Sequence, residues 1–296
     1  MTQREKHQAA LDSFVSRIKD DPHVIALLVY GSLAYGTVWE RSDIDAEMIV
    51  RDGTVVQGLW YTVEEGGVEI NINNFAELSK FKKALQELRG GFDHGILGKG
   101  NIVFSKDENL IEMFEDARKI GADDAARAFA AKINDLVNWM HKAEKWISAL
   151  DDPLYAQRFL HLAAAVVADM ELIRHMENPT RESIKRALQL NPELMHEVFT
   201  LPSTTAMTRE GVRQVLQILD SYLMEHMPWW SKSILRFMED GEIKKASHIL
   251  KSCGSVPLEY MAEKGLLLKT TEPSQIFKKS KLTLEEFAYF YVKEEI

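Results

Sequence analysis

Residues 24–50 read VIALLVYGSLAYGTVWERSDIDAEMIV and contain two apolar segments separated by a polar connection. The first segment, Val24–Tyr30, is an uninterrupted apolar run that ends at Gly31. Such a short run, bounded by turn residues, is typical of a strand buried on both faces. The second segment, residues 43–50, alternates acidic with apolar side chains, which is typical of a half-buried strand. The stretch therefore predicts two core strands joined through a Gly-Ser turn.

The acidic residues of the second strand predict a metal site. Asp43 and Asp45 point to the same face of a strand, about 6.6 Å apart. GVEININ, residues 67–73, alternates in the same way and places Glu69 on another half-buried strand. Three carboxylates suit a hard cation such as Mg²⁺. We therefore predict that Asp43, Asp45 and Glu69 bind two Mg²⁺ ions and are catalytic, while Glu47, on the same strand face, has a structural or solvated role.

The turn after the first strand predicts a phosphate site. Gly31 lets the backbone approach a ligand closely, and exposed N–H groups together with the Ser32 hydroxyl can donate to phosphate oxygens. A glycine-serine turn and an acidic strand are complementary parts of one nucleotide site. Two metal ions about 3.5 to 4 Å apart would then assist an attacking hydroxyl and a leaving pyrophosphate.

The motif in residues 30–45, YGSLAYGTVWERSDID, resembles the signature of the DNA polymerase beta-like nucleotidyltransferase superfamily. Ten residues separate Ser32 from Asp43, and Val68-Glu69-Ile70 is similar to the third strand element of that superfamily. The order of a mixed α/β domain and then helices looks like the kanamycin and lincosamide nucleotidyltransferase type. The resemblance covers residues 24–75 well; for the rest it is architectural.

The resemblance implies a nucleotidyltransferase that moves a nucleoside monophosphate, with AMP from ATP as the leading case, to a hydroxyl of a small acceptor. It implies Gly31, Ser32 and Ser42 as nucleotide-binding residues. Many relatives have Arg or Lys where this chain has Tyr35, so Arg41 is the alternative triphosphate contact; a solvated loop arginine is the competing interpretation. Relatives that build the site between subunits leave a homodimer open.

Two other functions remain open at this stage. One is nucleotide transfer to a protein or to an RNA end. The other is a non-catalytic, nucleotide-binding regulatory or antitoxin-like protein. The formal net charge of −9 argues against a nucleic-acid partner and favours a cationic small acceptor, of which aminoglycoside-like molecules are the leading case.

The composition predicts a cytoplasmic protein without a membrane partner. The N-terminal sequence MTQREKHQAAL lacks the apolar core of a signal peptide, and no apolar stretch is long enough to span a membrane. Cys253 is the single cysteine, so no internal disulfide can form.

The remaining periodicity predicts an α+β fold in three parts: residues 1–120 as the mixed-sheet catalytic domain, 121–240 as a helical, acceptor-binding bundle, and 241–296 as a small α/β appendage of winged-helix-like form. The expected helices include residues 75–88, stopped by Gly90-Gly91, one that begins after Thr208, and one after Thr283. For that last helix, Thr283 and Glu286 fit a capping box.

The general base is not determined by a motif. An acidic residue of the helical domain can deprotonate an acceptor hydroxyl. The acidic residues available there are Asp135, Glu144, Asp169 and Glu171. Asp169 interrupts an apolar run and is the nominal choice, against the simpler interpretation of a solvated helix carboxylate.

Overall fold

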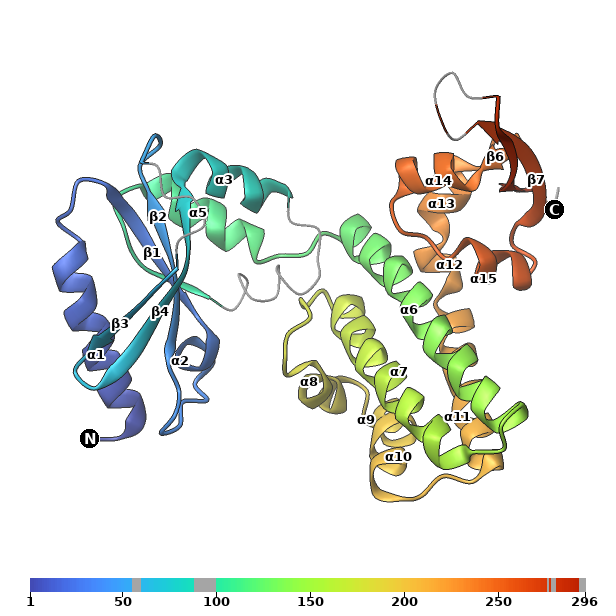
Figure 1. Ribbon diagram of the computed structural model, residues 1–296, viewed down its shortest axis with the longest axis horizontal. Helices are drawn as coiled ribbons and strands as arrows, with labels where there is room; N and C mark the ends of the chain where they lie inside the picture. Colours follow the sequence, from blue (N-terminus) through green and yellow to red (C-terminus); the bar gives the residue numbers. More distant parts are fainter. Residues whose placement is uncertain (55–59, 88–99, 276, 278–280, 293–296) are drawn as a thin grey trace. The chain divides into compact units, whose positions relative to one another are not determined.

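Five strands form a mixed sheet in the first of two units, Met1–Ile120 and Gly121–Ile296, of the computed structural model (Figure 1). The structure describes residues 1–54, 60–87, 100–275, 277 and 281–292. The strand order is β3-β4-β2-β1-β5. The strands are β1 (Val24–Tyr30), β2 (Ile44–Val50), β3 (Tyr61–Glu65), β4 (Val68–Glu77) and β5 (Asn101–Ser105). Strand β1 is antiparallel to β2 and β5, whereas β2 and β4 are parallel, so the predicted mixed sheet is confirmed.

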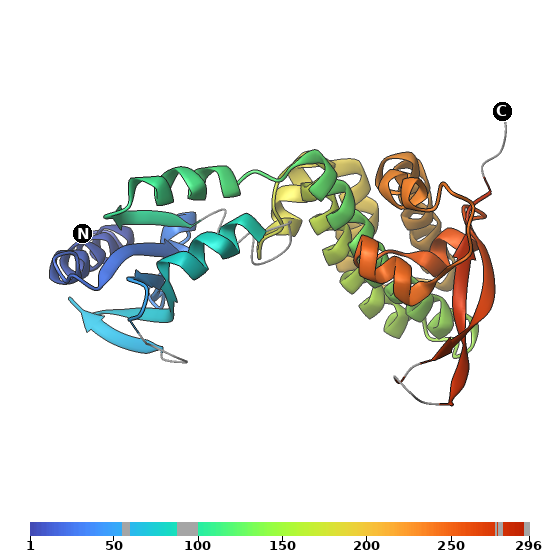
Figure 2. The same cartoon turned by 90° about the horizontal axis from the view of Figure 1, so that it is seen from above.

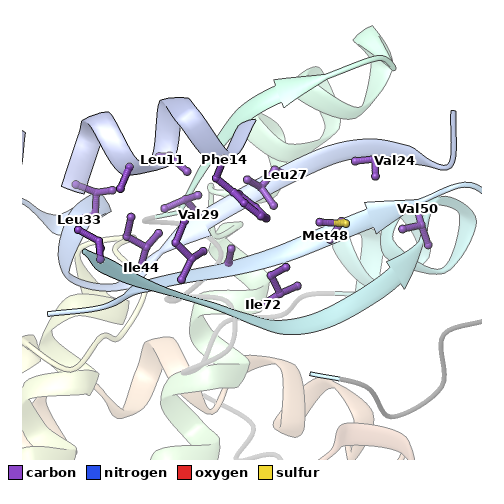
Figure 3. Close-up of a cluster of buried hydrophobic side chains, with 14 residues drawn as sticks. Leu11, Phe14, Val24, Leu27, Val29, Leu33, Ile44, Met48, Val50 and Ile72 are labelled. Carbon is purple, nitrogen blue, oxygen red and sulfur yellow. The ribbon is translucent and has the colours of Figure 1, made fainter. Parts of the chain in front are cut away.

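Helix α1 (Gln3–Ile18) covers one face of the sheet (Figures 2 and 3). It begins with a capping box in which Thr2 and Glu5 exchange hydrogen bonds. Its Leu11 and Phe14 belong to a buried cluster with apolar side chains of β1, β2 and β4. Ile44 of β2 is completely buried in this cluster, so the residues that alternate with it, Asp43 and Asp45, point to the opposite face.

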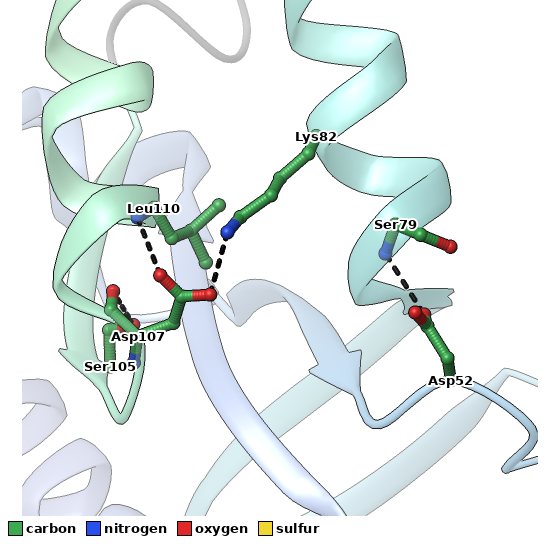
Figure 4. A network of polar contacts seen from close by, with 6 residues as sticks. All are labelled: Asp52, Ser79, Lys82, Ser105, Asp107 and Leu110. Carbon is green, nitrogen blue, oxygen red and sulfur yellow. Dashed lines mark hydrogen bonds and ion pairs between the residues drawn. The ribbon is translucent and has the colours of Figure 1, made fainter.

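Helices α3 (Leu78–Glu87) and α5 (Glu108–Ala117) cover that opposite face, where Phe81 and Phe114 join a second buried cluster. Asp107 connects the two helices (Figure 4). Its carboxylate caps α5 by accepting from the Leu110 N–H at 3.1 Å and also accepts from Lys82 Nζ of α3 at 2.7 Å. The hydrogen bond from the Lys82 ammonium lowers the pKa of Asp107. This ion pair therefore fixes α3 against the start of α5.

The second unit is mainly helical, as the periodicity of apolar residues beyond residue 121 predicts. Its two longest helices, α6 (Ala122–Ser148) and α7 (Pro153–Arg174), pack along each other, and α11 (Arg209–Glu225) packs on both. Thr208 caps α11 by accepting from the Gly211 N–H, as expected. The shorter segments are α8 (Ser183–Leu190), α9 (Pro192–Met195), the π-helical turn η1 (His196–Thr200), α10 (Leu201–Thr204), α12 (Met227–Trp230), α13 (Lys232–Phe237), α14 (Ala246–Cys253) and α15 (Leu258–Glu263).

The helix predicted after Thr283 is wrong. Residues Thr283–Phe290 form strand β8, the central strand of a small antiparallel sheet with β6 (Lys244–Lys245) and β7 (Leu268–Gln275). Glu286 does not cap a helix that begins after Thr283; its carboxylate accepts from the Ser247 N–H, in the first turn of α14, at 2.7 Å. Pairing along the whole of β7 and burial of Ala288 outweigh a local capping pattern. These residues lie in the unit Gly121–Ile296, and a separate winged-helix-like domain over 241–296 stays a prediction.

Three local details also differ from the sequence interpretation. Helix α3 begins at Leu78, because β4 continues through residues 75–77 beside β2. The turn after β1 is a short helix, α2 (Gly31–Tyr35), and the edge strand β3 was not predicted. The Gly90-Gly91 stop lies outside the described residues. Among the described helices, none has the length and apolar character that crossing a membrane requires.

Candidate functional site

The two halves of the sequence motif meet at Gly31 and Asp45. Tyr30, the last residue of β1, pairs with Asp45 across the antiparallel β1–β2 ladder, which brings the following glycine over the Asp45 carboxylate. Gly31 has φ +72°, and a Cβ atom added to it would lie 2.4 Å from Asp45 Oδ2. Both the backbone conformation and the space therefore require glycine here.

Ser32 follows Gly31 directly, and its hydroxyl is a hydrogen-bond donor that is not used within the described residues. Its Oγ atom is buried, and it has no hydrogen-bond partner within the part of the chain that the structure describes. A buried polar atom without a partner is uncommon, because it loses its bonds to water without replacement. A ligand oxygen at this corner would supply the missing partner, which fits the phosphate role predicted for Ser32.

Asp43 and Glu69 are connected through one asparagine. The Asn71 Nδ2 atom donates to Asp43 Oδ2 at 2.7 Å and to Glu69 Oε1 at 3.2 Å. The Thr62 hydroxyl of β3 donates to Asn71 Oδ1 at 2.6 Å. Because a carboxylate only accepts and the hydroxyl donates to the amide oxygen, this network fixes which way the Asn71 amide points.

Asp45 has a second asparagine partner. The Asn73 Nδ2 atom donates to Asp45 Oδ1 at 2.8 Å and to the Tyr30 hydroxyl oxygen at 3.1 Å. Burial, together with the negative charges of Asp45 and Glu47, raises the pKa of Tyr30 despite the bond from Asn73. The Tyr30 side chain is therefore neutral at ordinary pH and serves as an acceptor for Asn73.

The predicted ligands are near one another but do not form a ready three-carboxylate site. Among the described residues, no three His, Cys, Asp or Glu side chains are grouped so as to hold a metal ion. Asparagine amides lie between the acidic side chains instead. The donor set still consists of oxygen atoms suited to Mg²⁺, and the Gly31 backbone approaches Asp45 Oδ2 closely because it carries no Cβ atom. Asp43, Asp45 and Glu69 therefore fit a magnesium ion in the chemistry of their oxygen atoms.

Glu47 follows Asp45 on the same strand face and has its own asparagine partner. Asn74 Nδ2 donates to Glu47 Oε1 at 2.7 Å. Burial raises the pKa of Glu47, and the bond from Asn74 opposes that rise. This half-buried, hydrogen-bonded carboxylate agrees with the structural role expected from the sequence.

Ser42 and Arg41 have local partners. The Ser42 hydroxyl accepts from the Trp39 N–H at 3.1 Å, and the Ser42 carbonyl accepts from His7 Nε2 at 2.8 Å, so Ser42 holds the loop that precedes β2. The Arg41 guanidinium is exposed and lies 5.9 Å from the centre of the Trp39 ring. These contacts give Ser42 a structural role in the loop. The contact described for the Arg41 guanidinium is with the Trp39 ring.

A pocket of about 270 Å³ adjoins Asp43 and Glu69 and includes residues that sequence reasoning missed. Its wall is completed by Gln3, Lys6 and His7 from the first turns of α1. Lys6 Nζ donates to the Gly67 carbonyl at 2.9 Å, which places an ammonium group in this pocket. No motif marks these residues, because their position depends on how α1 packs across the sheet.

The nominal general base, Asp169, lies on α7 in the second unit. Lys132 of α6 donates to Asp169 Oδ2 at 2.7 Å, and both side chains are largely buried. The described contact of Asp169 is thus an ion pair within the helical unit. Glu171 is completely buried and paired with Arg174, so its contacts indicate a structural role.

Comparison with known proteins agrees with this geometry. Residues 14–109 match the family model described as polymerase beta, nucleotidyltransferase. The crystal structure of a nucleotidyltransferase-like protein from Exiguobacterium sibiricum 255-15 superposes with a TM-score of 0.61 at 13% sequence identity, over 97% of this chain and 99% of that chain. No curated protein matches the sequence. The similar structure shows that the fold is shared over nearly the full length. The family match identifies residues 14–109 as a nucleotidyltransferase domain of the DNA polymerase beta-like superfamily, and the Gly31-Ser32 corner, Asp43 and Asp45 lie within these residues.

Proposed function

We propose that this protein transfers a nucleoside monophosphate, with AMP from ATP as the leading case, to a hydroxyl of a small acceptor in a magnesium-dependent reaction. The contact of Gly31 with Asp45 supports the proposal, because it brings the turn predicted to bind phosphate against a carboxylate predicted to bind the metal. An aminoglycoside-like acceptor of the kanamycin and lincosamide type is the leading case, since a net charge of −9 favours cationic molecules over nucleic acids.

Asp43, Asp45 and Glu69 would hold the magnesium. When bound, the metal supplies positive charge that stabilises the leaving pyrophosphate and makes the acceptor hydroxyl easier to deprotonate. The Ser32 hydroxyl and the neighbouring backbone N–H groups donate to phosphate oxygens, and Arg41 is the candidate for a further phosphate contact. These donors fix the α-phosphorus in line with the acceptor.

The reaction forms one bond and breaks one. The acceptor oxygen bonds to the α-phosphorus, the bond from that phosphorus to the pyrophosphate oxygen breaks, and the acceptor proton passes to a base. Asp169, whose carboxylate pairs with Lys132, remains the nominal base in this proposal. A homodimer would be recognised by sedimentation of the purified protein.

The test uses each of the four nucleoside triphosphates labelled at the α-phosphate, with Mg²⁺ and a panel of hydroxyl-bearing small molecules. We expect label to move to one acceptor class and pyrophosphate to appear in equal amount. Asp43→Asn and Asp45→Asn should each remove more than about 99% of turnover, because an amide is a poor substitute for a charged metal ligand. Glu47→Gln, on the same strand face, is the matched control and should keep its activity.

The outcomes separate the competing functions. Label on the protein itself or on added RNA would replace the small acceptor by a macromolecular one. Nucleotide binding without transfer to any acceptor would support a regulatory or antitoxin-like protein and contradict the proposed enzyme.

A further inference from the structure

Each acidic side chain that residues 43–47 direct away from the α1-covered core is bonded to an asparagine of β4. The pairs are Asp43 with Asn71 at 2.7 Å, Asp45 with Asn73 at 2.8 Å, and Glu47 with Asn74 at 2.7 Å. We call these the three carboxylate–amide pairs. They form across the parallel β2–β4 ladder. Glu47 and Asn74 are directly opposite each other, whereas the other two bonds are diagonal: Asp45 is opposite Asn71, yet Asn71 bonds to Asp43 and Asn73 bonds to Asp45.

A bulge in β4 is needed to form all three pairs. The register runs from Ala46 opposite Ile72 to Glu47 opposite Asn74, so one residue of β4, Asn73, is extra. With strict alternation, Asn73 and Asn74 would point to opposite faces. The bulge lets both neighbouring asparagines reach carboxylates on the same face.

The amides determine the direction of the two predicted metal ligands. In each aspartate one carboxylate oxygen accepts from an asparagine, which turns the other oxygen in a defined direction. For Asp45, Oδ1 bonds to Asn73, and Oδ2 faces Gly31. Asp45 Oδ2 therefore lies at the corner that Gly31 and Ser32 form, where the Ser32 hydroxyl has no hydrogen-bond partner among the described residues.

The amides also lower the cost of placing like charges together. Asp43, Asp45 and Glu69 repel one another, and each donated N–H brings a partial positive charge to a carboxylate oxygen. Asn71 serves two of these groups at once and is itself oriented by Thr62. The carboxylates can therefore be held near their ligand positions before a cation arrives.

We propose that Asn71 and Asn73 are positioning residues that orient Asp43 and Asp45 for magnesium, whereas the chemically similar Asn74 is not part of this device. The inference rests on the proposed function. Asn71 and Asn73 act through the aspartates, so their loss should weaken metal binding more than it slows the reaction of the fully loaded enzyme. Groups that support metal ligands in this way typically contribute a factor of about 10 to 100 in metal affinity.

The test compares Asn71→Leu, Asn73→Leu and Asn74→Leu with the unchanged full-length protein. Leucine has nearly the shape of asparagine and cannot donate. Asn73 and Asn74 are adjacent, both exposed, and both bonded to a carboxylate of β2, so Asn74→Leu is a matched control. The rate of pyrophosphate release is measured over a magnesium series at saturating nucleotide, and thermal unfolding is measured without metal.

We expect Asn71→Leu and Asn73→Leu to raise the half-saturating magnesium concentration at least 10-fold and to recover most of the rate at saturating magnesium. Asn74→Leu should leave the magnesium curve unchanged. Unchanged curves in all three variants, or equal shifts in all three, would overturn the positioning role while leaving the proposed enzyme intact. A wild-type protein that shows no magnesium-dependent turnover or nucleotide binding would overturn both.

Discussion

Gly31 and Asp45 approach each other so closely that a single methyl group would separate them. The added Cβ atom would lie 2.4 Å from Oδ2 and 3.3 Å from Cγ of Asp45. Gly31 and Asp45 are fourteen residues apart in the sequence, but in the folded protein the glycine turn and the acidic strand are in direct contact. In the proposed enzyme, this contact would make Gly31 part of the active site as well as of the turn.

Gly31→Ala should abolish activity by displacing Asp45. We expect a loss of about 100-fold or more in turnover, because displacement of a catalytic group by about 1 Å has effects of that size. Gly36→Ala is the matched control: Gly36 also has φ +72°, but nothing lies within 4 Å of its added Cβ. Both variants should lose about 1 to 3 kcal/mol of unfolding free energy from the left-handed backbone. Equal activity in the two variants would contradict a direct effect on Asp45.

Ser32→Ala should separate nucleotide binding from stability. The Ser32 hydroxyl has no partner within the described residues, so its removal should not lower the unfolding temperature. The KM for the triphosphate should rise about 10- to 100-fold, the value of a hydrogen bond to a charged group. Ser183→Ala is the control variant. The Ser183 hydroxyl is also buried but, unlike the Ser32 hydroxyl, it is hydrogen-bonded to the backbone of Thr180. That variant should lose about 1 kcal/mol of stability and keep its KM. A Ser32→Ala variant with unchanged KM would remove Ser32 from the nucleotide site.

The connection of α3 to α5 through Lys82 and Asp107 should depend on pH. The pKa of Asp107 is lowered in the folded protein, so its contribution is complete above the ordinary carboxyl range and is lost as pH falls through the folded value. Asp107→Asn keeps a capping side chain but removes the charge, and should cost less than about 1 kcal/mol at pH 7. Asp107→Ala should cost about 1 kcal/mol more, because it also removes the cap. Urea unfolding at a series of pH values from 7 downwards measures both effects. A wild-type advantage over Asp107→Asn that does not shrink as the pH falls below the ordinary carboxyl range would contradict the assignment.

The buried pair of Glu171 and Arg174 should matter more than an exposed pair of the same chemistry. Glu171 is fully buried and accepts two hydrogen bonds from Arg174, at 3.1 and 3.0 Å. Glu171→Ala leaves the partly buried arginine without its carboxylate and should cost about 3 kcal/mol. Glu177→Ala, which removes the partner of the more exposed Arg186, should cost less than about 1 kcal/mol. Similar losses in the two variants, measured by denaturant unfolding, would show that burial does not govern these pairs.

The sequence was most informative where one physical requirement decided the outcome. Strand β1 has the predicted bounds, because an unbroken apolar run ends at a glycine that must leave the strand. The side chains of edge strand β3 are exposed or only partly buried, so they show no apolar pattern of a core strand. The strand forms because it pairs with β4, for example Thr62 with Asn71. Strand β8 was mistaken for a helix for a similar reason, since its long-range pairing with β7 outweighs a local capping pattern.

In the candidate site, the acidic residues were predictable from the sequence, but the asparagines that hydrogen-bond to them were not. Asp43, Asp45 and Glu69 follow from alternation along strands. The asparagine amides between them follow from a parallel register with a bulge, which no single segment contains. The pocket residue Lys6 depends on the packing of α1, and its distance of 61 residues from Gly67 leaves no local signal.

The most direct test of the central claim is calorimetric titration with a non-hydrolysable ATP analogue, because it requires no knowledge of the acceptor. The wild-type protein should bind the analogue with Mg²⁺ present and at least about 10-fold more weakly with the metal chelated. Asp45→Asn should abolish this dependence on Mg²⁺, whereas Glu47→Gln should retain it. Binding that is equally tight with and without Mg²⁺, or that is unaffected by Asp45→Asn, would contradict a magnesium site at Asp43 and Asp45.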